Sequence, residues 1–563
     1  MRGGPDSRQK SINQAQPAFG VRAIVPSYAK LRAGPRSAIV RKSLGDSFLE
    51  TAARFPGHLA VVSCQQKTRL TWSEYARMAQ RVAAGLRAIG MQPGDRAGIW
   101  ATTCAEWVAI QFGCALAGVV LVNVNPASRS HEISFVLRKS RMRALFLRTE
   151  DARANYRAIL QESRAGQAVA LERTIYLDTS DWEDFLREPD GMAVHSDPDE
   201  PANIQYTSGT TGEPKGVLLT HVNLVNNGRF FGDYLNLTER DRICIPVPLF
   251  HCFGSVIGSI TSAIKGAAAI FPAATFDPLA TLEAIDAEQA TAIYGVPAMF
   301  IAELQHPEFA RFQLKSLRTG VMAGAPCPVE IMRRVVEQMH CSQMLVAYGQ
   351  TESSPGITCS HADDDVETRC TTVGCPLPET EVRIASPTGE TLPTGERGEL
   401  LARGYMVMKG YDGLPEATAQ AIDADGWLHT GDLAVMRPDG YFKITGRSKD
   451  MIIRGGENIY PREIEEFLYT HPAVADAQVI GIPDERLGET VVAWIRLKAG
   501  QSTNEDEIRA FCREKLAYFK APQYVRFVDE FPMTLSGKAQ KFKMRQFEIE
   551  SRGLRELANR QTA

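Results

Sequence analysis

The chain has 563 residues, a formal net charge of −3 and 44% hydrophobic residues. This length is too great for one compact core, so two or more domains are expected. The near-neutral charge excludes the strong basic excess that general nucleic-acid binding requires. The 11 cysteines are irregularly spaced, which is typical of reduced thiols rather than of a disulfide framework.

The first 43 residues are basic, and Asp6 is their only acidic residue. They lack the apolar core of a secretory signal. Their composition is typical of a flexible extension, which we expect for residues 1–43, and it also suits an organellar transit peptide. We therefore predict a cytoplasmic protein, with the mitochondrial matrix as the alternative if this segment is a targeting peptide.

Alternating helices and strands are expected from about residue 44 onward. Residues 71–74 have capping-box spacing and predict a helix that runs to about Ile89. The longest apolar run, Trp107 to Val122, is shorter than the ~20 residues that a membrane span needs, so it predicts a buried helix followed by a buried strand. Further strands are expected at residues 97–100, 144–147, 242–248, 267–271 and 292–296. This alternation predicts an α/β fold in which parallel-rich sheets are covered by helices.

The stretch from Tyr206 to Gly216 reads Tyr-Thr-Ser-Gly-Thr-Thr-Gly-Glu-Pro-Lys-Gly and holds four serine or threonine hydroxyls, three glycines and one lysine. Glycines let backbone N–H groups approach an anion, and hydroxyls add further donors. A solvated turn would explain this composition but not Lys215 after a doubled Thr-Gly. The G-x-x-x-x-G-K-[ST] spacing of a P-loop is absent. We therefore predict a phosphate-binding loop of another kind.

The pattern changes near Gly446. Short strands are expected at residues 441–445 and 451–453, and a helix is expected after Pro461. Further strands are predicted near residues 477–482, 491–497 and 524–528, with a helix at about 506–518. These elements make a small α+β domain of roughly a hundred residues. We thus predict a large domain over 44–446, a hinge at 447–450 and a small mobile domain over 451–563.

Four motifs follow the phosphate loop: Tyr348-Gly-Gln-Thr-Glu352, Thr430-Gly-Asp432, Gly446-Arg447 and Pro532-Met-Thr-Leu-Ser-Gly-Lys538. In this order and approximate spacing, the five motifs resemble those of the adenylate-forming, or AMP-binding, superfamily. That superfamily contains acyl-CoA synthetases, luciferases and peptide-synthetase adenylation domains. The resemblance covers residues from about 45 to 545. The stretch 454–464 is most similar to medium-chain fatty acyl-CoA synthetases.

The resemblance implies an ATP-dependent acyl-CoA ligase that works in two steps. A carboxylate attacks the α-phosphorus of ATP to give acyl-AMP and pyrophosphate, and the thiol of coenzyme A then attacks the acyl carbonyl and releases AMP. Because an anionic nucleophile meets an anionic phosphate, catalysis depends on positioning and positive charge. ATP and coenzyme A are the expected cosubstrates and Mg²⁺ the expected cofactor. A homodimer is considered as the assembly.

Each matched residue has a role that the resemblance implies. Lys215, Glu352 and Lys538 are the predicted catalytic residues, and Glu352 with Thr207 would bind Mg²⁺. Asp432 is expected to accept hydrogen bonds from the ribose, with Arg447 beside it; the alternative for both is a surface ion pair. The predicted ATP-binding residues are Thr207, Ser208, Gly209, Thr210, Thr211, Gly212, Glu213, Pro214, Lys215, Gly324, Ala325, Pro326, Tyr348, Gly349, Thr351, Asp432, Arg447 and Lys538.

The second step is assigned to the small domain. Lys449 matches the family's hinge position, and the resemblance implies a rotation that withdraws Lys538 and brings the loop 454–458 to the acyl adenylate. Arg454 and Gly456 are the predicted coenzyme A-binding residues. Gly456 is expected to lie close to the thiol, where a side chain would obstruct it.

The acyl pocket is expected around the stretch 248–254. His251 and Phe253 are its predicted wall, and no acid–base role is assigned to His251. No lysine or arginine is placed to pair with a second carboxylate, so a monocarboxylic apolar acid is favoured, a medium-chain fatty acid first and an aromatic acid second. The alternatives are an enzyme that loads a carrier protein and a non-catalytic nucleotide-binding protein. The non-catalytic alternative is disfavoured because Lys538, Glu352 and Asp432 are all present.

Overall fold

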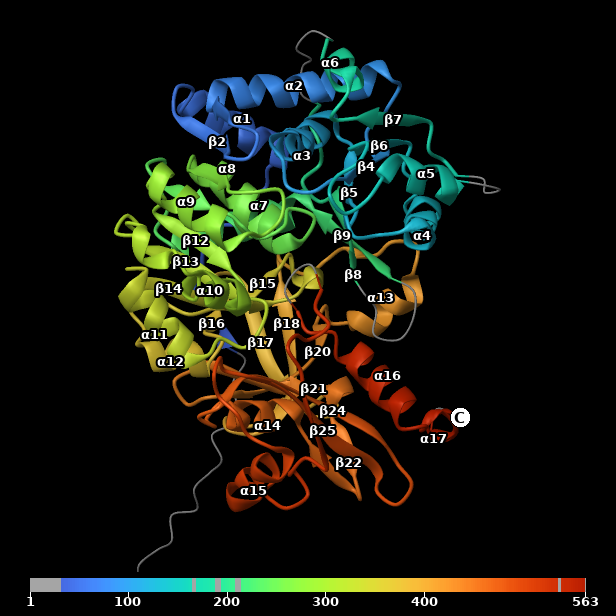
Figure 1. Cartoon of the computed structure of the whole chain (residues 1–563). Helices are drawn as coiled ribbons and strands as arrows, with labels where there is room; N and C mark the ends of the chain where they lie inside the picture. Colours follow the sequence, from blue (N-terminus) through green and yellow to red (C-terminus); the bar gives the residue numbers. More distant parts are fainter. Residues whose placement is uncertain (1–31, 165–168, 188–193, 208–213, 535–537, 562–563) are drawn as a thin grey trace, which may run out of the picture.

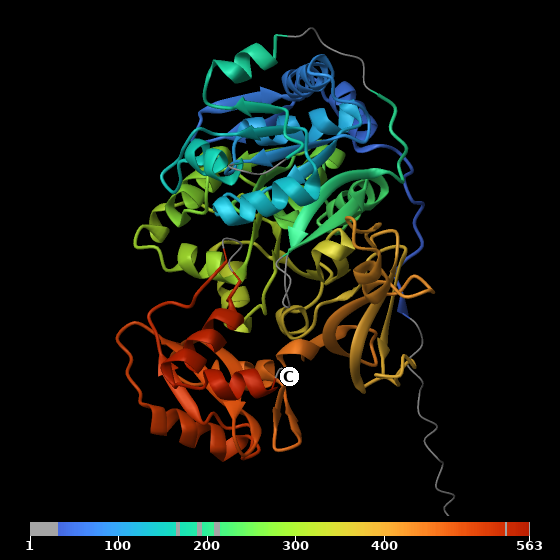
Figure 2. The same ribbon diagram turned by 90° about the vertical axis from the view of Figure 1, so that its right-hand side faces the viewer.

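Figure 1 shows the computed structural model, which describes residues 32–164, 169–187, 194–207, 214–534 and 538–561. The chain forms a large unit of three sheets with their helices and a small unit at the C-terminal end. The small unit, coloured orange to red, lies below the large one, and Figure 2 shows it beside a gold antiparallel sheet. The expected α/β architecture with a large and a small domain is confirmed.

The first parallel-rich sheet has seven strands in the order β19-β9-β8-β5-β4-β6-β7. The strands β8, β5, β4, β6 and β7 are parallel to one another. Strand β9 pairs antiparallel with β8, and β19 pairs antiparallel with β9. The strands are β4 (Arg96–Trp100), β5 (Val120–Asn123), β6 (Ala144–Leu147), β7 (Arg173–Tyr176), β8 (Pro201–Thr207), β9 (Lys215–Thr220) and β19 (Gly410–Tyr411). The associated helices are α1 (Leu44–Arg54), α2 (Trp72–Ala88), α3 (Ala105–Ala117), α4 (Ser130–Ser140), α5 (Tyr156–Arg164) and α6 (Ser180–Phe185).

The second parallel-rich sheet has nine strands in the order β16-β15-β14-β13-β12-β10-β11-β2-β3. It is parallel from β14 to β2 and antiparallel at both edges. The strands are β2 (Leu59–Ser63), β3 (Thr68–Thr71), β10 (Arg242–Cys244), β11 (Ala268–Phe271), β12 (Ala292–Gly295), β13 (Thr319–Ala323), β14 (Gln343–Gly349), β15 (Gly356–Cys359) and β16 (Cys375–Pro376). The helices are α7 (His221–Tyr234), the π-helix η1 (Phe253–Ile260), α8 (Thr261–Lys265), α9 (Pro278–Glu288), α10 (Pro297–Leu304), η2 (Phe309–Arg311), α11 (Val329–Gln338), η3 (Thr351–Ser353) and α12 (Val366–Thr371).

The third sheet of the large unit is wholly antiparallel, which the sequence did not predict. Its order is β1-β17-β18-β20-β21. The strands are β1 (Arg32–Ala33), β17 (Thr380–Ala385), β18 (Arg397–Gly404), β20 (Leu428–Met436) and β21 (Phe442–Arg447), and α13 (Pro415–Ala421) lies nearby. Alternate buried residues along β20 match a strand with one face on the core.

The small unit has one sheet of five strands, in which β23, β22, β25 and β24 follow one another and β26 pairs with β25. A short turn, η4 (Ser448–Asp450), leads into it. Its elements are β22 (Ile452–Arg454), β23 (Glu457–Ile459), α14 (Pro461–Leu468), β24 (Val474–Asp484), β25 (Gly488–Leu497), α15 (Glu505–Lys515), β26 (Tyr524–Phe527), α16 (Lys541–Ser551) and α17 (Arg555–Gln561). The predicted α+β character is confirmed.

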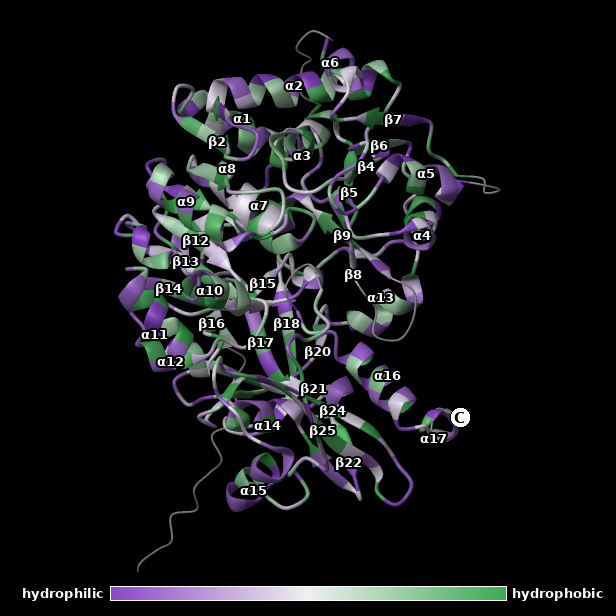
Figure 3. Ribbon diagram, viewed as in Figure 1, coloured by the Kyte–Doolittle hydropathy of each residue, from purple (hydrophilic) through white to green (hydrophobic). Residues whose placement is uncertain are grey.

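The main hydrophobic core joins the two parallel-rich sheets through α3. Trp107 and Phe112 of this helix are fully buried, and α3 leads directly into β5, as the apolar run predicted. Figure 3 shows hydrophobic residues on the inner strands and mostly hydrophilic ones on α15. No helix within the described ranges has the length and apolar character to cross a membrane.

The segment 34–43, part of the predicted extension, lies against the large unit. Asn226 accepts a hydrogen bond from the Val40 N–H at 2.8 Å and donates to the Val40 carbonyl at 2.9 Å. The Ser37 N–H donates to Glu379 Oε1 at 2.7 Å. The antiparallel sheet and α7 therefore both hold this segment, and residues 1–31 lie outside the described part of the chain.

Two predicted elements show how local sequence acts. The Thr71 side chain caps α2, and the Glu74 carboxylate accepts a hydrogen bond from the Thr71 N–H at 2.8 Å, as the capping box predicted. The strand expected over 242–248 is shorter, because β10 ends at Cys244. Pro246 and Pro248 follow and cannot donate to a neighbouring strand.

Candidate active site

The carboxylate of Asp432 lies at the centre of the first part of the site. It accepts a hydrogen bond from the Tyr348 hydroxyl at 2.7 Å and from Arg447 Nε at 2.8 Å. Asp432 lies opposite Arg447 in the β20–β21 pair and is 4% exposed, whereas the Arg447 side chain is half exposed. Burial, followed by the charge of Asp432, raises the pKa of Tyr348, so its hydroxyl stays a donor.

Glu352 and Lys215 both contact Tyr411. Glu352 lies in η3, just after β14, and its Oε1 accepts a hydrogen bond from the Tyr411 hydroxyl at 2.9 Å. The Lys215 ammonium group lies 4.8 Å from the centroid of the Tyr411 ring. The sequence motifs predicted Glu352 and Lys215 but not Tyr411, which lies almost two hundred residues beyond the phosphate loop.

The backbone of Lys538 is held by Thr534 of the small unit. The Lys538 N–H donates to Thr534 Oγ1 at 2.9 Å, and the Thr534 N–H donates to the Lys538 carbonyl at 2.8 Å. The side chain reaches into the large unit, where its Cε lies 3.8 Å from the place that a Cβ on Gly324 would take. Lys538 therefore belongs to the small unit while its side chain contacts the large one.

The surroundings of the Lys538 ammonium group are shared with the other site residues. The residue keeps solvent exposure along its length, but protein around the ammonium group desolvates it and lowers its pKa. Cys252, Asp432 and Glu352 act in the opposite direction, and Arg447 adds to the lowering. The lysine, two carboxylates and an arginine thus lie close enough for their charges to interact.

His251 and Phe253 lie at the start of η1, where the acyl pocket is expected. The Phe253 N–H donates to His251 Nδ1 at 3.2 Å, which places the imidazole proton on Nε2. Burial, then the Lys538 charge, lowers the pKa of His251 to about 3, so the ring is neutral. Cys252 Sγ lies 3.6 Å from His251 Nδ1, and the Phe253 ring stacks on Tyr294 at a centroid distance of 6.2 Å. The π-helical form of η1 is rare and often occurs at functional sites.

Further predicted ATP-binding residues lie at or near the ends of β13, β14 and β9. Gly324 adopts a left-handed conformation with φ +85, and Gly324, Ala325 and Pro326 are exposed. Gly349 is required by packing, since a Cβ there would lie 1.7 Å from the Pro355 carbonyl oxygen. Two further predicted residues, Thr351 and Pro214, are described, Thr351 as buried and Pro214 as exposed.

The phosphate loop itself is described only at its two ends. Thr207 ends β8, Lys215 begins β9, and the Thr207 hydroxyl donates to the Lys215 carbonyl at 3.4 Å. The remaining predicted residues, Ser208, Gly209, Thr210, Thr211, Gly212 and Glu213, lie outside the described residues.

The residues assigned to coenzyme A and to the hinge lie on the small unit or at its start. Arg454 Nη1 donates to the Phe519 carbonyl at 2.7 Å, within the small unit. Gly456 has φ +89, and a Cβ there would meet no heavy atom within 4 Å. Lys449 lies in η4 and is exposed. In this orientation the structure does not bring Arg454, Gly456 and Lys449 to the residues around Lys538.

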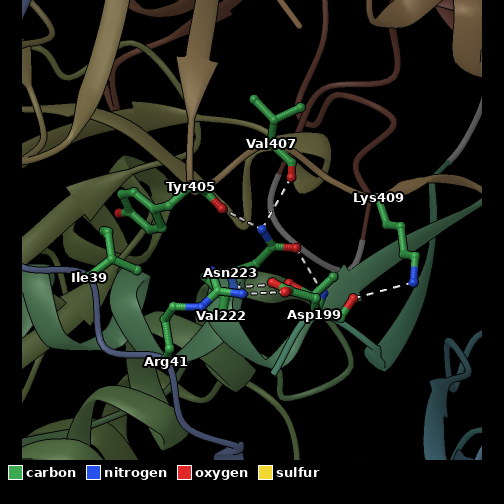
Figure 4. A pocket seen from close by; sticks show the side chains of 9 residues that line it. Ile39, Arg41, Asp199, Val222, Asn223, Tyr405, Val407 and Lys409 are labelled. Atoms are coloured by element: carbon green, nitrogen blue, oxygen red, sulfur yellow. Dashed lines mark hydrogen bonds and ion pairs between the residues drawn. The ribbon is translucent and has the colours of Figure 1, made fainter. Parts of the chain in front are cut away.

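A cavity of about 510 Å³ lies elsewhere, between the segment 34–43, α7 and the loop after β18. Figure 4 shows the Asn223 amide donating to the carbonyls of Tyr405 and Val407 at its floor. None of the predicted site residues lines it. The lining residues are Ile39, Arg41, Asp199, Thr220, Val222, Asn223, Tyr405, Val407 and Lys409.

Comparison with known families agrees with the motifs. The family described as AMP-binding enzyme matches residues 48–412, and its C-terminal domain matches residues 463–538. The chain belongs to the AMP-binding enzyme family. YngI of Bacillus subtilis is 46% identical over 539 residues, which cover 91% of this chain and 98% of that protein. Medium-chain acyl-CoA ligase ACSF2, mitochondrial, of Danio rerio is 43% identical over 524 residues, covering 88% of this chain and 86% of that protein.

A solved structure extends the likeness to three dimensions. ATP-bound MatB from Rhodopseudomonas palustris superposes with a TM-score of 0.82 and 29% identity, covering 90% of this chain and 99% of that one. Apo MatB from the same organism superposes with a TM-score of 0.74, at the same identity and coverage. The family and its named relatives support ATP-dependent acyl-CoA ligation through an acyl adenylate, which confirms the predicted reaction class.

Proposed function

We propose that the protein joins a medium-chain fatty acid to coenzyme A. One observation carries the proposal: the Lys538 side chain of the small unit reaches the large unit beside Gly324, where the charges of Asp432, Arg447 and Glu352 act on it. A positive charge that arrives from a separate unit suits a reaction in which two anionic reactants must meet. The name of the Danio rerio relative, a medium-chain acyl-CoA ligase, supports the choice of acid.

The predicted ATP-binding residues have distinct proposed tasks. Asp432 would accept hydrogen bonds from the ribose hydroxyls. Tyr348 and Arg447 already donate to its carboxylate and hold it in place. Lys215 and the loop before it would hold the β- and γ-phosphates. Lys538 would contact the substrate carboxylate and the α-phosphate together and offset the charge that develops there.

Mg²⁺ is the proposed cofactor, and the residues fit it. Glu352 Oε1 accepts a hydrogen bond from Tyr411, while Oε2 accepts none from any residue that the structure describes. Together with the Thr207 hydroxyl, this carboxylate supplies the hard oxygen ligands that Mg²⁺ takes beside phosphate groups. When bound, the ion would offset phosphate charge.

The neutral His251 ring supports an apolar acyl site. Its proton lies on Nε2, so it can donate one hydrogen bond to the acid without adding a full charge. We place His251 and Phe253 in the wall of the acyl pocket. An aromatic acid is the second candidate, which the choice of test acids addresses.

We propose domain limits at 44–446 and 451–563, with a hinge at 447–450. The turn η4 between β21 and β22 supports this hinge, because short element-terminal segments absorb domain rotation. The rotation would bring Arg454 and Gly456 to the acyl adenylate for reaction with coenzyme A. The close approach expected at Gly456 belongs to that second orientation, since its surroundings are open in this one.

Compartment and assembly complete the proposal. We propose the cytoplasm, with the mitochondrial matrix as the alternative, because the relatives include both a bacterial protein and proteins named mitochondrial. A homodimer is the proposed assembly to test. Cell fractionation and light scattering of the purified chain decide these two points.

The deciding experiment measures AMP release with Mg-ATP across straight-chain acids from acetate to palmitate, plus benzoate and cinnamate. Each acid is run with and without coenzyme A, and with the Lys538→Ala variant. A coenzyme A-dependent maximum at a medium chain length, lost in the variant, is expected. A maximum with benzoate or cinnamate would favour the aromatic alternative, and no AMP release with any acid would favour a carrier protein as the acceptor.

A further inference from the structure

The segment 408–412, named the bridge segment, links strand β9 to the turn that contains Glu352. The Met408 N–H donates to the Glu352 carbonyl at 2.9 Å, and the Asp412 N–H donates to the Gly216 carbonyl at 2.7 Å. Between these two hydrogen bonds, β19 pairs antiparallel with β9. The backbone of the bridge segment therefore fixes the distance between the end of the phosphate loop and η3.

Tyr411, in the middle of the bridge segment, repeats this link with its side chain. Its hydroxyl donates to Glu352 Oε1 at 2.9 Å, and its ring faces the Lys215 ammonium group at 4.8 Å. A carboxylate oxygen is an acceptor, so the Tyr411 hydroxyl is the donor in this hydrogen bond.

The bridge segment is itself held on both sides. Arg96 of β4 forms two hydrogen bonds to the Asp412 carboxylate, at 2.6 and 2.8 Å. On the other side, the loop that leads into the segment is held by Asn223 of α7, as Figure 4 shows. The Tyr411 N–H donates to Thr418 Oγ1 at 2.9 Å. Tyr411 is thus anchored through its backbone, which leaves its side chain to act on the two charged groups.

We propose that Tyr411 is a positioning residue for Mg-ATP. Its hydroxyl would orient Glu352 so that Oε2 can bind Mg²⁺, and its ring would hold the Lys215 ammonium group at the described end of the phosphate loop. The proposal rests on the functions proposed above for Lys215 and Glu352. A residue that only packs would tolerate loss of the hydroxyl as long as the ring remained, so the two parts of the side chain can be tested separately.

The test measures the dissociation constant of ATP by titration calorimetry on the full chain, with excess Mg²⁺ and with excess EDTA. In Tyr411→Phe, which keeps the ring, the dissociation constant should rise about tenfold with Mg²⁺, because a hydrogen bond to a charged group is lost. With EDTA it should stay within about twofold. Tyr411→Leu removes the ring as well, so the constant should also rise with EDTA, by about threefold.

Tyr441→Phe is the matched control. The Tyr441 hydroxyl donates a 2.6 Å hydrogen bond to Asp364, which is not among the residues proposed to bind ATP. Its ATP affinity should equal that of the wild type. The proposal is overturned if Tyr411→Phe binds Mg-ATP as tightly as the wild type, or if Tyr441→Phe loses as much. Failure of the wild type to bind ATP at all would instead overturn the proposed function together with this inference. If Tyr411→Leu does not fold, the two phenylalanine variants decide the question.

Discussion

The Arg397 guanidinium lies 4.2 Å from the centroid of the Tyr460 ring, and this contact joins the large unit to the small one. Arg397 begins β18, and Tyr460 caps α14 of the small unit. A second link lies close by, where Lys443 Nζ is 3.6 Å from the Glu466 carboxylate. Both contacts lie outside the residues proposed to bind substrates, so they favour this orientation of the small unit without taking part in the chemistry.

Replacing Arg397 by Ala should therefore shift the balance between the two half-reactions. A cation–π contact at a partly exposed position contributes about 0.5–1 kcal/mol, so adenylation should slow by about two- to fivefold. Thioester formation from supplied acyl-AMP should stay equal or rise. Pyrophosphate exchange and thioester formation are measured separately. The control is Arg383→Ala, because Arg383 lies 4.5 Å from the Trp427 ring within the large unit. An equal decrease in both half-reactions would contradict the prediction.

Lys538→Ala should separate the half-reactions more strongly. The charges of Asp432 and Glu352 act on the Lys538 ammonium group, and its loss from the proposed site should lower adenylation by about 10²-fold or more. Thioester formation from supplied acyl-AMP should fall by less than about threefold if the rotation withdraws the lysine. Rates of the two steps are compared with those of Lys543→Ala, which changes a lysine on α16 instead. Similar losses in both steps would argue against a lysine that acts in adenylation alone.

His221 should make the large unit sensitive to acid. It is 3% exposed, its Nδ1 accepts the Leu44 N–H at 3.1 Å, and burial lowers its pKa to about 4. The unfolded chain takes up a proton below about pH 6.5, whereas the folded one does so only near pH 4. The stabilisation is present above about pH 6.5 and is lost as the pH falls toward 4, by about 1 kcal/mol between pH 7.5 and 5.5.

His221→Asn keeps an acceptor near the Leu44 N–H and removes this titration. Its melting temperature should fall less than that of the wild type between pH 7.5 and 5.5. Part of the acid sensitivity should remain, because the pKa of His251 is lowered in the same direction. The control is His195→Asn, since the His195 side chain is 86% exposed. A wild-type acid sensitivity unchanged in His221→Asn would refute the assignment.

Local sequence predicted those parts of the fold that local physics decides. The α2 capping box, the α3–β5 run and the alternation of strands and helices all depend on neighbouring residues. The motif residues Asp432, Glu352 and Lys538 were found because the motifs that contain them resemble those of the AMP-binding superfamily. In the structure the charges of Asp432 and Glu352 act on the Lys538 ammonium group, and the roles of these three residues in the reaction stay proposals.

Contacts between segments that are far apart in the chain could not be predicted from the sequence. Strand β19 meets β9 although Tyr411 and Val217 are far apart in the sequence, and two residues are too few to show a strand period. Asn226 holds the segment 34–43 through backbone groups, which any sequence would offer. Tyr411 was missed for the same reason: a lone tyrosine after a glycine shows nothing until the fold places it beside a lysine and a glutamate.

Glu303 is a charged residue type in an apolar core. It lies on α10 with 0% exposure, and neither of its carboxylate oxygens has a hydrogen-bond partner among the described residues. Burial raises its pKa well above the ordinary value, so the folded protein holds it protonated. Glu303 is not part of the proposed site, so replacing it tests the stability of the fold separately from substrate binding.

The Glu303 carboxyl should weaken the fold as the pH rises. The unfolded chain loses this proton near pH 4.5, while the folded chain keeps it, so stability is fully present below that pH and falls by about 1.4 kcal/mol per pH unit above it until the raised pKa is reached. Glu303→Gln cannot titrate, so its melting temperature relative to the wild type should climb steadily from pH 5.5 to 7.5. The exposed Glu337→Gln change on α11 should show no such trend. Parallel curves for Glu303→Gln and the wild type would mean that the carboxyl ionises in the folded state, which its unpartnered burial argues against.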